Sequence, residues 1–107
     1  MTFSYPFAGI KTSNNDAGQY ISNQINFIGS NFVGIVQAPD HSPDDYRTYG
    51  QLDTNNIALL NSDHPTYIVY SYATPIAWHS QKHGWVIPAI RYSVTTSKHQ
   101  SIVRRAI

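Results

Sequence analysis

The final stretch of the chain, residues 66–107, constrains the fold more strongly than any other part. Residues 67–72 are almost all aromatic or β-branched, and such side chains favour a pleated, half-buried surface. Odd and even positions would face opposite sides of a sheet, because strand side chains alternate. Pro75 lacks the N–H that a ladder needs, so we expect a bend or bulge at residues 73–75 before residues 76–78 continue as strand.

A hairpin is predicted next in the same stretch. Residues 80–84 are polar and end in Gly84, which is typical of a hairpin loop of about five residues. Residues 85–87 return as the partner strand, and residues 90–94 would complete it. Pro88 interrupts this strand, so we expect the strand to lie at a sheet edge or to bulge there.

A helix is predicted to close the chain. Ser97, followed three residues later by Gln100, fits a capping box, and Thr95 and Thr96 are competing caps. One helix face is marked by residues spaced i, i+3, i+4 and i+7: His99, Ile102, Val103 and Ala106. A helix of about ten residues is marginal alone in water, so we expect it to form by packing this face on the sheet.

A second helix is predicted at residues 14–28. Ser13 is a candidate cap, and Asp16 suits the positive end of the helix dipole. Gly29 is a plausible stop signal in the left-handed conformation. The apolar stripe consists of Ala17, Tyr20, Ile21, Ile25, Phe27 and Ile28.

The remaining segments give shorter elements. Residues 2–7 alternate as a short edge strand whose pairing is limited by its proline, and residues 32–37 indicate another strand. Residues 38–51 are rich in turn formers and predict a loop. Residues 54–60 are compatible with either a helix or a strand.

These segments predict an α+β fold in one domain, residues 1–107. We expect a small antiparallel sheet of three to five strands, with an N-terminal helix and a C-terminal helix packed on it. The hairpin and the closing helix at residues 66–107 are its most recognisable part.

Composition limits the classes of function. The chain contains no cysteine, which excludes disulfides, a thiolate nucleophile and cysteine zinc sites. No apolar run is long enough to span a bilayer, and the N-terminus lacks the layout of a signal peptide. We expect a cytoplasmic protein that has no contact with a membrane.

Charge is distributed unevenly along the chain. All six acidic residues are aspartates within residues 1–65, whereas five of the seven lysines and arginines lie in residues 66–107, which contain no acid. The favoured interpretation is that the two halves offset each other within one domain. The alternative is that the basic half contacts an acidic partner.

No motif predicts catalysis or a bound cofactor. His79 and His83 have metal-ligand spacing on a helix, but here they flank a predicted hairpin loop, so no metal site is expected. Asp44 and Asp45 near His41 indicate a solvated loop rather than an acid–base site. The hydroxyls and the imidazole of residues 93–99 are better explained by capping and packing than by nucleophilic chemistry.

Aromatic and basic residues give a candidate nucleic-acid surface. Tyrosines on adjacent strands can stack on bases, and cations of the closing segment can contact phosphates. The candidate contacts are Tyr70, Tyr72, Arg91, Lys98, Arg104 and Arg105. The competing interpretation places the aromatic rings in the core between sheet and helix.

One further pattern carries a family resemblance. Residues 70–78 read YSYATPIAW, Trp85 and Pro88 follow, and residues 92–100 read YSVTTSKHQ. This combination resembles a family of small, uncharacterised proteins carried by bacteriophages and mobile elements. The resemblance covers about the last forty residues and implies a phage or mobile-element setting, but it assigns no role to individual residues.

Two functions are consistent with these observations. The first is a non-enzymatic, phage-type accessory protein that binds and modulates a host protein, such as a defence factor, in the manner of an anti-CRISPR inhibitor. Its candidate protein contacts are Asp40, Asp44, Asp45 and Asp53. The alternative is a small nucleic-acid-binding module that uses the aromatic sheet and the basic helix. A homodimer is left open.

Overall fold

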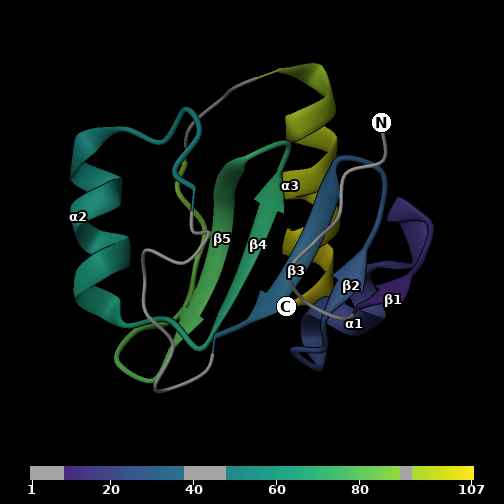
Figure 1. Cartoon of the computed structure of the whole chain (residues 1–107), viewed down its shortest axis with the longest axis horizontal. Coiled ribbons are helices and arrows are strands. Elements are labelled where there is room, and N and C mark those ends of the chain that lie inside the picture. The colour runs from purple at the N-terminus through teal and green to yellow at the C-terminus, as the bar shows by residue number, and fades with distance from the viewer. Residues whose placement is uncertain (1–8, 38–47, 90–92) are drawn as a thin grey trace.

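A six-stranded sheet forms the middle layer of the computed structural model (Figure 1). The structure describes residues 9–37, 48–89 and 93–107. The strands are β1 Ile10–Lys11, β2 Phe27–Ile28, β3 Phe32–Val36, β4 Tyr67–Ser71, β5 Thr74–Ser80 and β6 Gly84–Val86. They lie side by side in chain order, with β1 parallel to β2 and every other neighbouring pair antiparallel.

Helical segments cover both faces of this sheet (Figure 1). They are the 3₁₀ turn η1 Asn14–Asp16 and the α-helices α1 Gly18–Ser22, α2 Thr54–Asp63 and α3 Val94–Ala106. α1 and α3 pack on one face, whereas α2 covers the other. No helix within the described ranges is long and apolar enough to cross a membrane.

The predicted α+β class, with an N-terminal and a C-terminal helix, is confirmed. The prediction of an antiparallel sheet of three to five strands is wrong, because the sheet has six strands and is mixed. β1 and β2 have only two residues each, which is too short for an alternating pattern to be recognised. The predicted edge strand at residues 2–7 lies outside the described residues, as do residues 38–47 of the predicted loop.

The first hairpin was missed by sequence reasoning. Residues 67–78 do not form one bent strand, because the chain reverses at Tyr72 and Ala73, and Ser71 pairs with Thr74. Tyr72 has a φ of 56°, in the left-handed region that Gly and Asn usually occupy. Without such a residue at the turn, the sequence gives no hairpin signal there.

The second hairpin lies where it was predicted. Residues 81–83 connect β5 to β6, and Trp85 pairs with His79. The partner strand is shorter than expected, however, because β6 ends at Val86. Val94 belongs to α3, so the predicted strand at residues 90–94 is wrong at that position, and residues 90–92 lie outside the described residues.

The N-terminal helix is much shorter than the predicted 14–28. α1 ends at Ser22, and the N–H groups of Gln24 and Ile25 bond to the carbonyls of Ile21 and Tyr20. This is a Schellman ending with Gln24 in the left-handed conformation at a φ of 53°. The predicted stop at Gly29 is therefore wrong. A glutamine occupies the stop position, and its residue type does not indicate a helix end.

The two longer helices both begin at side-chain caps. Asp53 caps α2, which settles the helix-or-strand ambiguity of residues 54–60 in favour of a helix. Ser93 caps α3 by accepting from the Thr96 N–H at 3.1 Å, so α3 begins one turn before the predicted capping box at Ser97. The expectation that Ile102 and Val103 pack inward is confirmed, since both are buried.

The core consists of two clusters separated by the sheet. Alternation along β4 sends Tyr67 and Val69 to the α1 and α3 side, and Ile68 and Tyr70 to the α2 side. Every residue of β4 is buried, as expected for a strand covered on both faces. Gly34 has no room for a side chain, since a Cβ there would collide with the Tyr67 hydroxyl and the Phe27 ring.

Candidate functional site

The most completely buried polar cluster surrounds His99 on α3. We call Asn14, Ser71, Thr96 and His99 the His99 network. The His99 Nδ1 lies 2.7 Å from the Ser71 Oγ, and its Nε2 lies 3.2 Å from the Asn14 Nδ2. The ring stacks on Phe32 at 4.4 Å between centroids, with the planes 9° apart. His99 is 2 % exposed, and its contact with Ser71 is buried, whereas its contact with Asn14 is partly buried.

Hydrogen bonds to Ser30 fix the orientation of the Asn14 amide. Its Oδ1 accepts from the Ser30 N–H at 2.8 Å, and its Nδ2 donates to the Ser30 carbonyl at 3.0 Å. The atom that faces the His99 Nε2 is therefore a donor, which makes this ring nitrogen an acceptor. It follows that His99 is neutral and donates its Nδ1–H to Ser71. Burial also lowers the pKa of His99.

The serine, histidine and asparagine of this cluster belong to the residue types found in hydrolase triads. Two features argue against that chemistry here. Ser71 is only 1 % exposed, and the nitrogen beside it donates a proton instead of accepting one, so the hydroxyl is not activated. Ser71 also lies 3.0 Å from the Thr96 Oγ1, which continues the network to the start of α3.

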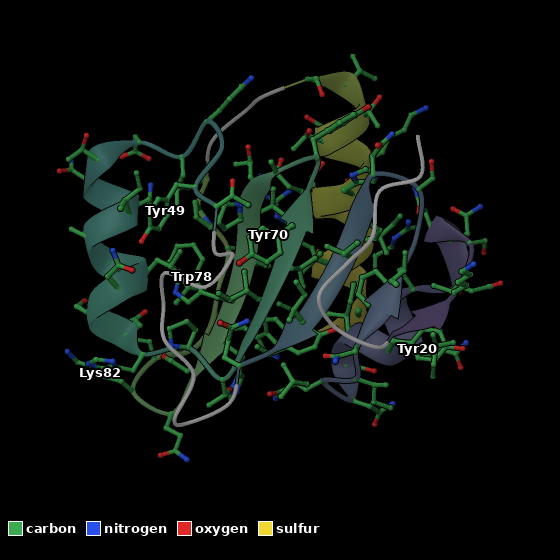
Figure 2. The ribbon with its side chains drawn as sticks, viewed as in Figure 1. Tyr20, Tyr49, Tyr70, Trp78 and Lys82 are labelled. Carbon is green, nitrogen blue, oxygen red and sulfur yellow. The ribbon has the colours of Figure 1, made fainter. Side chains whose placement is uncertain are left out.

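A second polar cluster lies on the α2 side of the sheet. Asp63, the last residue of α2, accepts from the Trp78 Nε1 at 3.0 Å and from the His83 Nδ1 at 2.7 Å. We call Asp63, Trp78 and His83 the Asp63 cluster. The carboxylate side chain is fully buried, whereas the His83 side chain is 43 % exposed. The indole of Trp78 points from β5 toward α2 (Figure 2).

The Asp63 cluster orients one imidazole toward solvent. A buried carboxylate holds the Nδ1 of His83 while part of the imidazole side chain is exposed, an arrangement also found in many metal and acid–base sites. His79 is held elsewhere, with its Nδ1 3.1 Å from the Thr66 Oγ1. The two histidines of the H-x3-H spacing thus have separate partners. No group of three metal-ligating side chains occurs within residues 9–37, 48–89 and 93–107.

The exposed surface near the start of α3 has a different character. Tyr72 is 54 % exposed and Val94 is 76 % exposed. Tyr72 is tied into the fold from two sides, because its N–H donates to the Asn31 carbonyl at 2.8 Å and its ring centroid lies 6.4 Å from that of His99. Cations project from the solvent side of the same helix: Lys98, Arg104 and Arg105.

The candidate contact residues are distributed as follows. Tyr70 lies in the core on the α2 side (Figure 2) and is 5 % exposed, so its ring does not present a stacking face to solvent in this conformation. Asp53 is exposed at the start of α2, and the Asn56 amide that donates to it lowers the pKa of its carboxyl group. Four candidates lie outside the described residues: Asp40, Asp44, Asp45 and Arg91.

Sequence reasoning missed the partners that give both clusters their geometry. Asn14 and Ser71 lie 85 and 28 positions from His99, and Asp63 lies 20 positions from His83. Single polar residues at such separations carry no local pattern. One weak signal was available, because a histidine at an apolar position of a helix needs buried partners for its ring nitrogens.

Comparison with family models assigns the sequence to a family. A model for a family of unknown function (DUF8033) matches residues 16–103. The chain belongs to this family. The DUF8033 match includes the Asp63 cluster and all of the His99 network except Asn14. No curated protein and no solved structure matches the chain. The expectation of an uncharacterised family is thus confirmed, whereas the phage or mobile-element setting and the pattern at residues 70–100 as its mark stay predictions.

Proposed function

We propose that the protein is a non-enzymatic accessory protein that acts by binding another protein. The observation that carries this proposal is that the potentially reactive side chains form hydrogen bonds inside the fold. Ser71 and His99 are buried against each other, and the Asp63 carboxylate is occupied by Trp78 and His83. Side chains with these hydrogen bonds stabilise the fold. A partner would therefore bind through exposed residues.

The surface near the start of α3 is the best candidate for that contact. Tyrosine is enriched at the energetic centres of interfaces, because it contributes a large, rigid contact area and a hydroxyl. Tyr72 combines exposure with an unfavourable backbone angle, and such angles persist where the surrounding structure holds them, often at functional sites. The apolar Val94 adds exposed area at the start of α3.

The sequence resemblance supplies the rest of this proposal. A phage or mobile-element setting suggests a host protein as the partner, with a defence factor such as a CRISPR effector as the target. The acidic candidates follow from the same idea, since aspartates can meet a basic nucleic-acid channel. Of these, Asp53 is exposed in the structure.

Site-specific cross-linking tests the proposal directly. A photoreactive phenylalanine analogue replaces Tyr72 in the full-length protein, which is then irradiated in host cells. We expect one discrete cross-linked protein, identified by mass spectrometry. The matched control carries the analogue at Lys82, which is exposed on the β5–β6 loop, and should not cross-link to the same protein. Absence of any protein adduct from both positions would argue against the proposed function.

Nucleic-acid binding is a second candidate, favoured by the cations of α3. Lys98, Arg104 and Arg105 are exposed, and α3 carries no acidic residue. Binding of a fluorescent oligonucleotide should weaken steeply with salt and decrease when Arg104 and Arg105 are both changed to Ala. No anisotropy change with single-stranded or double-stranded probes at low salt would eliminate this candidate.

A further inference from the structure

The hydrogen bonds around His99 suit a neutral imidazole and oppose a protonated one. A protonated ring would carry an N–H at Nε2, facing the Nδ2–H of Asn14. Rotation of the Asn14 amide would present its oxygen instead, but that rotation breaks both hydrogen bonds to Ser30. The cluster therefore cannot accept the extra proton by this rotation without losing hydrogen bonds.

Among residues 9–37, 48–89 and 93–107, no acidic group in contact with His99 compensates for the charge. The uncharged groups that face it are Asn14 from η1, Phe32 from β3 and Ser71 from β4. Thr96 of its own helix joins the network through Ser71. The one titratable side chain facing it within the described residues is Tyr72, a ring neighbour. The remaining charged groups on η1 and α3 are exposed to solvent. Asp16 of η1 bonds to Ser13, α3 carries Lys98, Arg104 and Arg105, and α1 carries no charged residue.

The same contacts join parts of the chain that are distant in sequence. Asn14 belongs to the first helical turn, Ser71 to the strand before the Tyr72 turn, and Thr96 to the first turn of α3. We infer that the His99 network is an acid-sensitive fastening. It holds η1, β4 and α3 together while His99 is neutral, and it releases α3 from η1 when His99 takes up a proton. Because Tyr72 follows Ser71 directly, release also alters the exposed surface around that tyrosine.

The direction of the pH effect follows from linkage. Burial lowers the folded-state pKa of His99 below its ordinary value of 6.5, so the unfolded chain takes up the proton first as the pH falls. The stability that neutral His99 contributes is complete above about pH 6.5 and decreases as the pH falls through the folded-state pKa. Acid therefore loosens this part of the molecule, and alkali has no comparable effect.

Nitrogen NMR of the wild-type protein tests the state of the ring without any substitution. Two-bond ¹H–¹⁵N spectra distinguish protonated from unprotonated ring nitrogens. At about pH 7.5, one pH unit above the ordinary histidine value, we expect His99 to show a protonated Nδ1 and an unprotonated Nε2. Its midpoint on acidification should be lower than the ordinary histidine value of about 6.5. A protonated Nε2 at neutral pH, or a midpoint at or above about 6.5, would overturn the inference.

Asn14→Asp provides a matched substitution that reverses the electrostatics. A carboxylate facing Nε2 favours the imidazolium, so the His99 midpoint should rise above the wild-type value. The urea midpoint of this variant should then decrease less between about pH 7 and about pH 5 than that of the wild type. His64→Asn is the control, since asparagine tolerates the left-handed backbone there, and it should retain the wild-type decrease. Equal decreases in wild type and Asn14→Asp would refute the fastening.

Discussion

The His99 network and the Asp63 cluster lie on opposite faces of the sheet, and the two clusters differ in their access to solvent. His99 is almost fully enclosed among neutral partners, whereas His83 exposes nearly half of its side chain beside the buried carboxylate of Asp63. A neutral ring can be enclosed if its nitrogens are satisfied. A carboxylate that can carry charge needs donors, and here one of them reaches the surface.

This contrast predicts how much stability a substitution should cost on each side of the sheet. On the α2 side, the Asp63 carboxylate holds two donors, from β5 and from the β5–β6 loop. On the α3 side, the contacts pass through several weaker, neutral hydrogen bonds. Charge-assisted hydrogen bonds are roughly twice as strong as neutral ones. We therefore expect the largest single loss from the α2 side and smaller, more distributed losses from the α3 side.

The largest effect is predicted for Asp63→Ala. The substitution leaves the Trp78 Nε1–H buried without its acceptor and removes the partner of His83. We expect the free energy of unfolding, measured by urea denaturation, to decrease by about 2–3 kcal/mol. His83→Gln should cost less, because its side chain is partly exposed and the Trp78 contact remains. Equal losses from the two substitutions would contradict the central role of the carboxylate.

A smaller effect is predicted for Ser71→Ala on the α3 side. It removes the acceptor of the His99 Nδ1–H and one contact of Thr96. Loss of a buried neutral hydrogen-bond partner should decrease the free energy of unfolding by about 1–2 kcal/mol. Ser101→Ala is the control, because Ser101 is exposed on the same helix, and it should change this quantity by less than about 0.5 kcal/mol. A loss larger than that of Asp63→Ala would reverse the comparison.

The comparison also shows which features a sequence can predict. The alternation of residues 67–71 and the inward side of α3 depend on local periodicity, and the second hairpin depends on its polar loop. These predictions agree with the structure. The Tyr72 turn and the end of α1 depend on single residues in left-handed conformations that their types do not favour. Local propensity cannot predict such positions, because tertiary contacts hold them there.

The two clusters were unpredictable for a related reason. Histidine and serine in a strand or helix are usually interpreted as surface or capping residues, and their burial depends on partners brought close by the fold. The Asn14 amide is oriented toward His99 by its two hydrogen bonds to the backbone of Ser30. Three of the four acidic candidate contacts lie outside the described residues, and Asp53 has a structural role as the cap of α2. Neither role is visible from spacing alone.

An effect of intermediate size is predicted for the cap of α3. Ser93→Ala removes the acceptor of the Thr96 N–H and the hydroxyl that contacts the Thr96 Oγ1. Loss of a serine cap should decrease the free energy of unfolding by about 1 kcal/mol. Ser93→Thr, which keeps the hydroxyl, should restore most of it. If both variants lose equal stability, the side-chain oxygen is not the stabilising group.

The smallest effects on stability are predicted for the exposed cations, and this separates folding from binding. Lys98→Gln and Arg105→Gln remove charges from the solvent side of α3, where neither side chain is buried. Each should change the free energy of unfolding by less than about 0.5 kcal/mol, apart from a small loss for Arg105 near the negative end of the helix dipole. Lys82→Gln, on the β5–β6 loop, is the matched control from the other side of the molecule.

If the α3 surface is the contact, cross-linking from Tyr72 should decrease in the α3 variants and persist in Lys82→Gln. Equal cross-linking in all three would place the partner's contact away from these cations, whereas a large loss of stability would show that the charges support the fold.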